Sequence, residues 1–171
     1  MARDEGLESV IVCEDDLNFS RDFNSRVHSM LADLASNDWG LCYAGHLDLA
    51  LNLADAISPV PPFRGIMGMH FMIMRRCFFL PFIPYLEAIL ARPPGHPDGG
   101  PMHIDGALSH FRADHPEFKT VAVTPVLGYQ RPSRTDIHAL RWYDRVPFIR
   151  YAAELARRSR SSRRVQRRDM V

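Results

Sequence analysis

The chain of 171 residues is long enough for one domain of ordinary size, and apolar residues make up 46% of it, enough to fill a hydrophobic core. This composition excludes a disordered chain, and every long apolar stretch is interrupted by charged residues or prolines, which argues against a membrane span. The net charge is +1, but residues 150–171 hold eight of the 21 basic residues and two of the 20 acidic ones, which leaves 13 basic and 18 acidic residues in 1–149.

The three cysteines, Cys13, Cys42 and Cys77, show no metal-ligand spacing. Cys13 and Cys42 lie in apolar runs that look like strands, so we expect both to be buried free thiols. Free thiols are typical of a reducing compartment, and we therefore expect a cytoplasmic protein.

The first predicted element is a strand over 10–13 that ends on three consecutive carboxylates, Glu14, Asp15 and Asp16. Its residues are β-branched or small and apolar, which predicts a strand buried on both faces, as in a parallel sheet. Ligands bind outside the carboxyl ends of such strands. In an extended chain Glu14 and Asp16 point to one side, about 6.5 Å apart, where one Mg²⁺ or Mn²⁺ could bridge them. The alternative is a turn whose acids cap the next helix.

A strand–helix–strand unit is predicted for the first quarter of the chain. Residues 20–35 carry apolar side chains at helical spacing, and 39–45 form an apolar run closed by a glycine. This order favours a βαβ unit with a parallel pair of strands.

The rest of the chain gives a less regular pattern. We predict an irregular segment over 46–64, a buried strand over 65–74, a helix over 78–91, a proline- and glycine-rich loop over 93–101, a short helix over 105–113, a strand over 120–127, a loop over 131–141, and a last helix capped by Asp144. His70 lies in the apolar 65–74 run and is interpreted as a hydrogen-bonded core residue. His103 and His138 are candidates for completing a metal site or binding diphosphate.

The opening strand resembles the start of a receiver domain, in which an apolar strand precedes an acidic pair that binds Mg²⁺. Such a domain also needs a phospho-acceptor aspartate after its third strand, and 65–74 contains no acid. It needs a lysine at the end of a later strand, whereas Lys119 precedes one. A receiver-like signalling domain therefore stays an alternative.

A second resemblance covers about 130 residues. A strand ending in Glu-Asp-Asp is followed by a helix, a tryptophan-led strand, a glycine-led strand with an aromatic (68–71), an aspartate opening a short helix (Asp105), and Ser133-Arg134-Thr135-Asp136-Ile137. In this order they resemble the C-terminal two-thirds of the family 25 glycosyltransferases of lipopolysaccharide biosynthesis. Members of that family carry a further stretch ahead of the acidic strand, so we expect this chain to lack the N-terminal part.

The resemblance implies a three-layer α/β sandwich of the GT-A type, incomplete at its N-terminus, that transfers a sugar such as galactose from a nucleotide-sugar to a saccharide acceptor. It implies that Glu14 and Asp16, with His138, hold Mn²⁺ or Mg²⁺. Asp105 is the expected catalytic base for an inverting reaction. Asp15, Ser133 and Asp136 are the expected contacts to the nucleotide-sugar. An inactive relative that binds sugar without transferring it is a further alternative.

We expect the glycosyltransferase-like domain to occupy 1–149 and an amphipathic helix with an Arg-rich, disordered tail to occupy 150–171. If the acceptor is linked to lipid, the tail and this helix would hold the protein to an anionic membrane surface, as a peripheral protein of the inner membrane. No aromatic residues are interleaved with the arginines, so nucleic acid is not a predicted partner.

Overall fold

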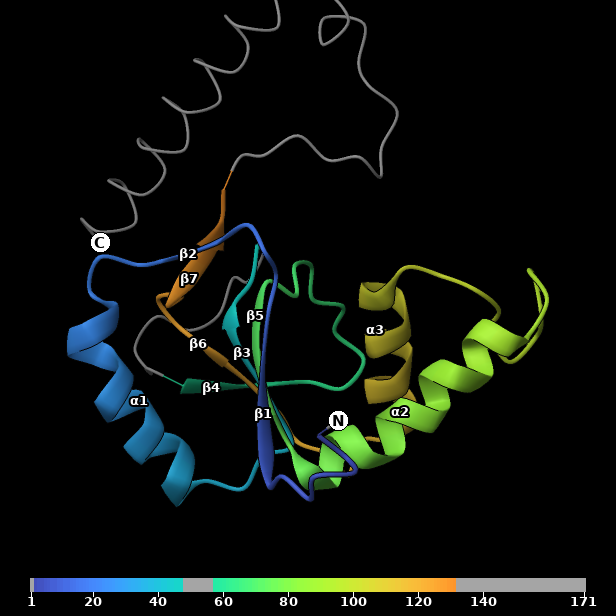
Figure 1. The fold of residues 1–171 in the computed structure, drawn as a ribbon, viewed down its shortest axis with the longest axis horizontal. Helices are drawn as coiled ribbons and strands as arrows, with labels where there is room; N and C mark the ends of the chain where they lie inside the picture. Colours follow the sequence, from blue (N-terminus) through green and yellow to red (C-terminus); the bar gives the residue numbers. More distant parts are fainter. Residues whose placement is uncertain (1, 48–56, 132–171) are drawn as a thin grey trace, which may run out of the picture. The chain divides into compact units, whose positions relative to one another are not determined.

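The computed structural model of the protein describes residues 2–47 and 57–131. Residues Met1–Tyr129 form one compact unit, and Gln130–Val171 form a second, of which Gln130 and Arg131 are described. In the first unit a mixed five-stranded sheet lies between α1 on one face and α2 with α3 on the other (Figure 1). The predicted α/β class is confirmed, whereas the GT-A type within that class stays a prediction.

The elements follow one another as β1 (Ser9–Cys13), β2 (Leu17–Phe19), α1 (Phe23–Ser36), β3 (Leu41–Gly45), β4 (Ile57–Val60), β5 (Phe71–Arg75), α2 (Arg76–Ala91), α3 (Ile104–Asp114), β6 (Thr120–Val123) and β7 (Gly128–Gln130). The larger sheet has the order β1, β5, β3, β6, β4, and β2 pairs with β7 in a two-stranded sheet. Strand β5 is antiparallel to both neighbours, β3 and β6 are parallel, and β4 is antiparallel to β6.

The opening strand forms as predicted, but its predicted environment is wrong. Strand β1 is an outer strand that runs antiparallel to β5, and four of its five residues are exposed. The predicted parallel pair of β1 with β3 is also wrong, because β5 lies between these two strands. A short apolar run has the same composition in a buried parallel strand and in an outer strand, so composition could not distinguish the two.

The three helices predicted within the described residues form with small shifts at their ends, and each buries one face. Met30 and Leu34 of α1 are buried under one face of the sheet, with Trp39 and Val123. Phe78 and Phe82 of α2 pack against Phe111 of α3 on the other face, with ring centroids 5.2 and 5.0 Å from that of Phe111. Edge-to-face and tilted ring pairs of this kind stabilise cores beyond the burial of their area.

The other strand predictions need correction at their bounds. The strand predicted over 65–74 begins only at Phe71, and the one predicted over 120–127 ends at Val123. The short strands β2 and β7 were not predicted, and β4 was missed inside a segment predicted as irregular. Strand β4 contains Pro59, which has no N–H to donate and is tolerated in an outer strand such as this one. Because prolines usually interrupt strands, the sequence of this segment did not predict the strand β4.

A buried arginine fixes the loop that follows β4. Arg112 of α3 is 1% exposed, and its guanidinium donates to the hydroxyl of Thr120 and to the carbonyls of Arg64 and Pro61, each at 2.9 Å. Burial lowers the pKa of Arg112, and each of its three nitrogens donates one of these hydrogen bonds. One side chain thus links α3, β6 and residues 61–64.

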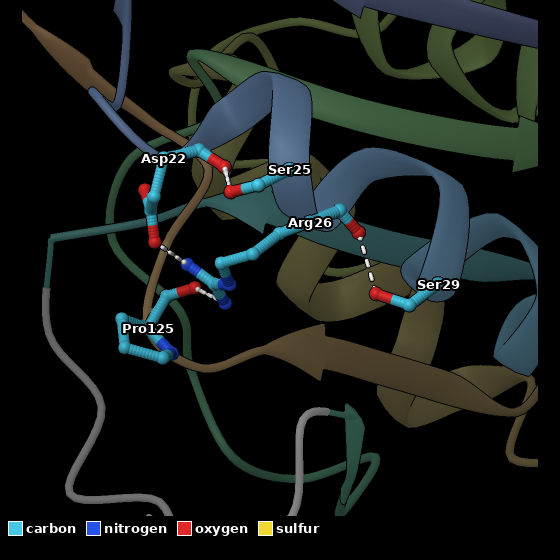
Figure 2. Close-up of polar contacts among 5 residues, drawn as sticks. All are labelled: Asp22, Ser25, Arg26, Ser29 and Pro125. Atoms are coloured by element: carbon cyan, nitrogen blue, oxygen red, sulfur yellow. Dashed lines mark hydrogen bonds and ion pairs between the residues drawn. The ribbon is translucent and has the colours of Figure 1, made fainter.

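A second arginine anchors the first turn of α1 (Figure 2). Arg26 pairs with the carboxylate of Asp22 at 3.0 Å and donates to the carbonyl of Pro125 at 2.7 Å. The hydroxyls of Ser25 and Ser29 donate to the carbonyls of Asp22 and Arg26, each three residues earlier. This network connects α1 to the chain that leaves β6.

The cysteine prediction is half right. Cys42 in β3 is buried, which raises its pKa to about 12, whereas Cys13 at the end of β1 is exposed. The predicted helix from Asp144 and nearly all of the predicted 131–141 loop lie outside the described residues. Within 2–47 and 57–131, no helix combines the length and the hydropathy that a membrane crossing requires.

Candidate active site around His70

The three carboxylates after β1 lie in a tight turn and not in extended chain. The N–H of Leu17 donates to the carbonyl of Glu14 at 3.1 Å, which closes the turn before β2. The N–H of Glu14 donates to the carbonyl of His70 at 3.1 Å, which fixes the turn beside the start of β5. The premise that Glu14 and Asp16 point to one side of an extended strand is therefore wrong. The helix-capping alternative is also wrong, because β2 separates the acids from α1.

His70 lies at the centre of this region and is fully buried. Its Nε2 is 3.1 Å from the carbonyl of Gly128. A carbonyl only accepts, so Nε2 carries the proton, and in the neutral ring Nδ1 is a bare acceptor. Nδ1 has no hydrogen-bond partner among the described residues. The interpretation of His70 as a hydrogen-bonded core residue is confirmed.

Two glycines make the space that this imidazole occupies. A Cβ at Gly45 would lie 2.6 Å from the His70 ring and 2.8 Å from the carbonyl oxygen of Gly128. A Cβ at Gly68, which has a φ of +84°, would lie 3.1 Å from Nδ1 of His70 and 2.9 Å from Cγ of Leu47. Both positions therefore require glycine for close packing, and Gly68 requires it for its backbone as well.

Asp105, on α3, contacts the backbone of Gly68, two residues before His70. It lies in the first turn of that helix, where the helix dipole favours negative charge, and its Oδ2 accepts a long hydrogen bond of 3.4 Å from the N–H of Gly68. Asp105 and Asp16 both interact electrostatically with His70. We call Asp16, His70 and Asp105 the His70 cluster.

The balance of forces on His70 favours the neutral ring. Burial lowers the pKa of His70 from the ordinary value of 6.5. The hydrogen bond to Gly128 and the two carboxylates raise this pKa, but the effect of burial is larger. The cluster therefore combines a neutral imidazole with two acids from distant parts of the chain.

The structure unites some of the predicted site residues and leaves others untested. Asp16 and Asp105 both act electrostatically on His70, Glu14 belongs to the same turn as Asp16, and Asp15 is exposed there. His103 is an exposed residue directly before α3. The predicted residues Ser133, Asp136 and His138 lie outside the described residues. Within the described ranges, no group of three or more His, Cys, Asp or Glu side chains could hold a metal ion.

The electrostatic contact of Asp16 and Asp105 with His70 was not predicted from the sequence. No local pattern indicates it, because Gly45 and Gly68 show their role only when the fold brings them against the imidazole. Exposed apolar side chains adjoin the cluster as well: Leu47 donates its N–H to the carbonyl of Met67 at 2.9 Å, and the exposed side chain of Ile104 precedes Asp105.

A scan against protein-family models gives no match to the sequence, and a search of the curated proteins also gives none.

The buried state of His70 predicts a pH dependence of stability. A histidine with a lowered pKa in the folded state is more easily protonated when unfolded, so stability is fully present above pH 6.5 and falls as the pH drops below it. In the unmodified chain the free energy of unfolding should decrease between pH 7 and 5.5, partly because of His70. His70→Gln keeps an N–H for Gly128 but cannot be protonated, so we expect a smaller decrease in this variant. Denaturant unfolding at several pH values measures the decrease in both proteins. The exposed-site control His28→Gln should keep the fall, and an unchanged pH slope in His70→Gln would contradict a buried neutral ring.

Proposed function

We propose that this chain is a metal-dependent glycosyltransferase of the GT-A type. It would move a sugar, with galactose as the first candidate, from a nucleotide-sugar to a saccharide acceptor of a cell-surface glycan. The observation that supports this most is that the acidic turn is bonded to the carbonyl of His70 while Asp105 accepts the N–H of Gly68, two residues earlier, because the proposed reaction needs a cation site and a base close together.

The acidic turn fits the cation that such a reaction uses. Mg²⁺ is commonly bound by one or two carboxylates, with substrate phosphates as further ligands, so a complete cage of protein ligands is not required. Glu14 and Asp16 would hold Mn²⁺ or Mg²⁺, and His138 is the proposed third protein ligand. When bound, the cation would neutralise the charge that the diphosphate gains as it leaves.

Asp105 is the proposed base. One of its oxygens accepts the N–H of Gly68, and it lies in the first turn of α3. It would take the proton of the acceptor hydroxyl as the new glycosidic bond forms. Asp15, Ser133 and Asp136 are the proposed contacts to the nucleotide-sugar.

The two alternatives differ in how they agree with the structure. A receiver-like domain has a parallel sheet, whereas β5 lies antiparallel between β1 and β3 and ends on Arg75. No observation favours that alternative. A relative that binds sugar without transferring it would keep the same cluster, and a transfer assay distinguishes it from an enzyme.

A thermal-shift experiment tests the proposal. We expect Mn²⁺ together with one nucleoside diphosphate sugar, from a panel that includes UDP-galactose, to raise the Tm of the full chain by several degrees, because a ligand that binds the folded state stabilises it. Asp16→Asn should lose most of this shift. The matched control Asp33→Asn makes the same chemical change on the exposed surface of α1 and should keep it. A panel without any response beyond that to Mn²⁺ alone would contradict the proposal.

A further inference from the structure

Nδ1 of His70 is a buried acceptor without a hydrogen bond. The ring is fully buried, Nε2 donates to the carbonyl of Gly128, and Nδ1 has no hydrogen-bond partner within 2–47 and 57–131. Nearly all buried polar atoms of folded proteins have a partner, because burying a polar group without a hydrogen bond costs free energy. An exception of this kind therefore calls for an explanation, and contact with a ligand is one.

Nδ1 lies one side chain below the surface. This edge of the ring faces Gly68, because a Cβ at Gly68 would lie 3.1 Å from Nδ1 and 2.9 Å from Cγ of Leu47. Leu47 thus lies over Nδ1, and Leu47 is 51% exposed. Exposed side chains change rotamer within nanoseconds, so a turn of the Leu47 side chain would open Nδ1 to a ligand at the surface.

The groups around Nδ1 determine which ligand chemistry fits. Nδ1 of the neutral ring only accepts, and the carboxylate of Asp105 accepts the N–H of Gly68, the residue that Nδ1 faces. Asp16 and Asp105 both act electrostatically on His70, and they would repel an anion such as phosphate. A hydroxyl group donates a hydrogen bond without adding charge. A sugar hydroxyl therefore fits Nδ1, whereas an anion does not.

The main chain of His70 indicates which sugar would reach it. Its carbonyl accepts the N–H of Glu14, so His70 is bonded directly to the acidic turn. Under the proposed function, the cation at this turn binds the diphosphate of the nucleotide-sugar. The transferred sugar is attached to that diphosphate, and it is therefore the part of the substrate closest to His70.

We propose that His70 is a specificity-determining residue, whose Nδ1 accepts a hydrogen bond from a hydroxyl group of the transferred sugar when the side chain of Leu47 turns aside. This inference rests on the proposed function and adds the residue that distinguishes one donor sugar from another. A sugar without this hydroxyl would be rejected, because the buried acceptor then gains no partner.

The nitrogen NMR signal of Nδ1 in the full chain tests the proposal without a substitution. Long-range proton–nitrogen correlation separates the bare Nδ1 from the protonated Nε2, and a bare imidazole nitrogen moves upfield when it accepts a hydrogen bond. With Mg²⁺, a nucleotide-sugar that binds, from a panel that includes UDP-galactose, should move the Nδ1 signal upfield, whereas its nucleoside diphosphate alone should leave it in place. The signals of His28, exposed on α1, should not move.

Calorimetric binding to His70→Gln provides a second measurement. Glutamine keeps an N–H for Gly128 but has no acceptor at the position of Nδ1. The Kd of the nucleotide-sugar should therefore rise about tenfold, while that of its nucleoside diphosphate stays within about twofold. His28→Gln is the matched control and should keep both values. If His70→Gln does not fold, the Nδ1 signal of the unmodified chain decides.

The outcomes separate this inference from the proposed function. Binding of a nucleotide-sugar with an unmoved Nδ1 signal, or an equal change of both Kd values in His70→Gln, would overturn the role of His70 and leave the proposed function standing. If no member of the panel binds, the proposed function is contradicted, and the role of His70 with it.

Discussion

Replacing Gly45 with alanine is expected to lower the free energy of unfolding by about 3 kcal/mol. The added methyl group would lie 2.6 Å from the His70 ring and 2.8 Å from the carbonyl oxygen of Gly128, which is backbone and cannot swing away. Gly45 ends the central strand β3, all of whose residues are buried, so the strand cannot shift without cost. Either the hydrogen bond from His70 to Gly128 breaks or the strand moves.

Gly65→Ala is the matched control for this prediction. No atom lies within 4 Å of a Cβ at Gly65, and its φ lies outside the left-handed region, so the change should be neutral or slightly stabilising. Denaturant unfolding of both variants measures the difference. Equal stabilities would show that the packing around His70 is loose, which would also weaken the case for a fixed cluster.

Arg112→Met is expected to cost a similar amount, about 3 kcal/mol. Methionine fills much of the same volume, but it removes the donor to the hydroxyl of the buried Thr120 and to the carbonyl of Arg64, and it leaves the carbonyl of Pro61 with the N–H of Arg64 alone. Leaving a buried polar group such as the hydroxyl of Thr120 unsatisfied costs more than the hydrogen bond itself contributes.

Arg21→Met provides the comparison, because Arg21 is exposed and the same substitution there should change stability by less than about 0.5 kcal/mol. Hydrogen exchange adds a local readout: the amide of Arg64, which donates to the carbonyl of Pro61, should exchange faster in Arg112→Met. Unchanged exchange at Arg64 would mean that Arg112 does not fix this loop.

The helices α1 to α3 and the strands β1, β3, β5 and β6 could be predicted from the sequence, whereas the short strands β2, β4 and β7 and the pairing of the strands could not. The apolar spacing of α1 reflects one buried face, and the glycine and apolar run of β3 reflect a central strand. Strand β1 was predicted as buried because four apolar residues do not reveal how many neighbours a strand has. The insertion of β5 between β1 and β3 depends on contacts between distant residues, which no local pattern records.

The candidate site divides in the same way. The acids at 14–16 were visible because they interrupt an apolar run, and Asp105 was suggested by a resemblance and not by its surroundings. Their meeting at His70 depends on the pairing of β1 with β5, which places Glu14 beside His70. Gly45 and Gly68 matter only through the imidazole that they accommodate, so their role could not be predicted before the fold was known.

We propose that the acidic turn and Asp105 form one cation-dependent site beside His70. Paramagnetic broadening of amide NMR signals by Mn²⁺ in the presence of UDP tests this proposal. We expect broadening of the amides of Asp16, Gly68, His70 and Asp105, with little effect at Asp33 on α1, and loss of this pattern in Asp16→Asn. Broadening centred elsewhere, or a pattern unchanged in Asp16→Asn, would contradict it.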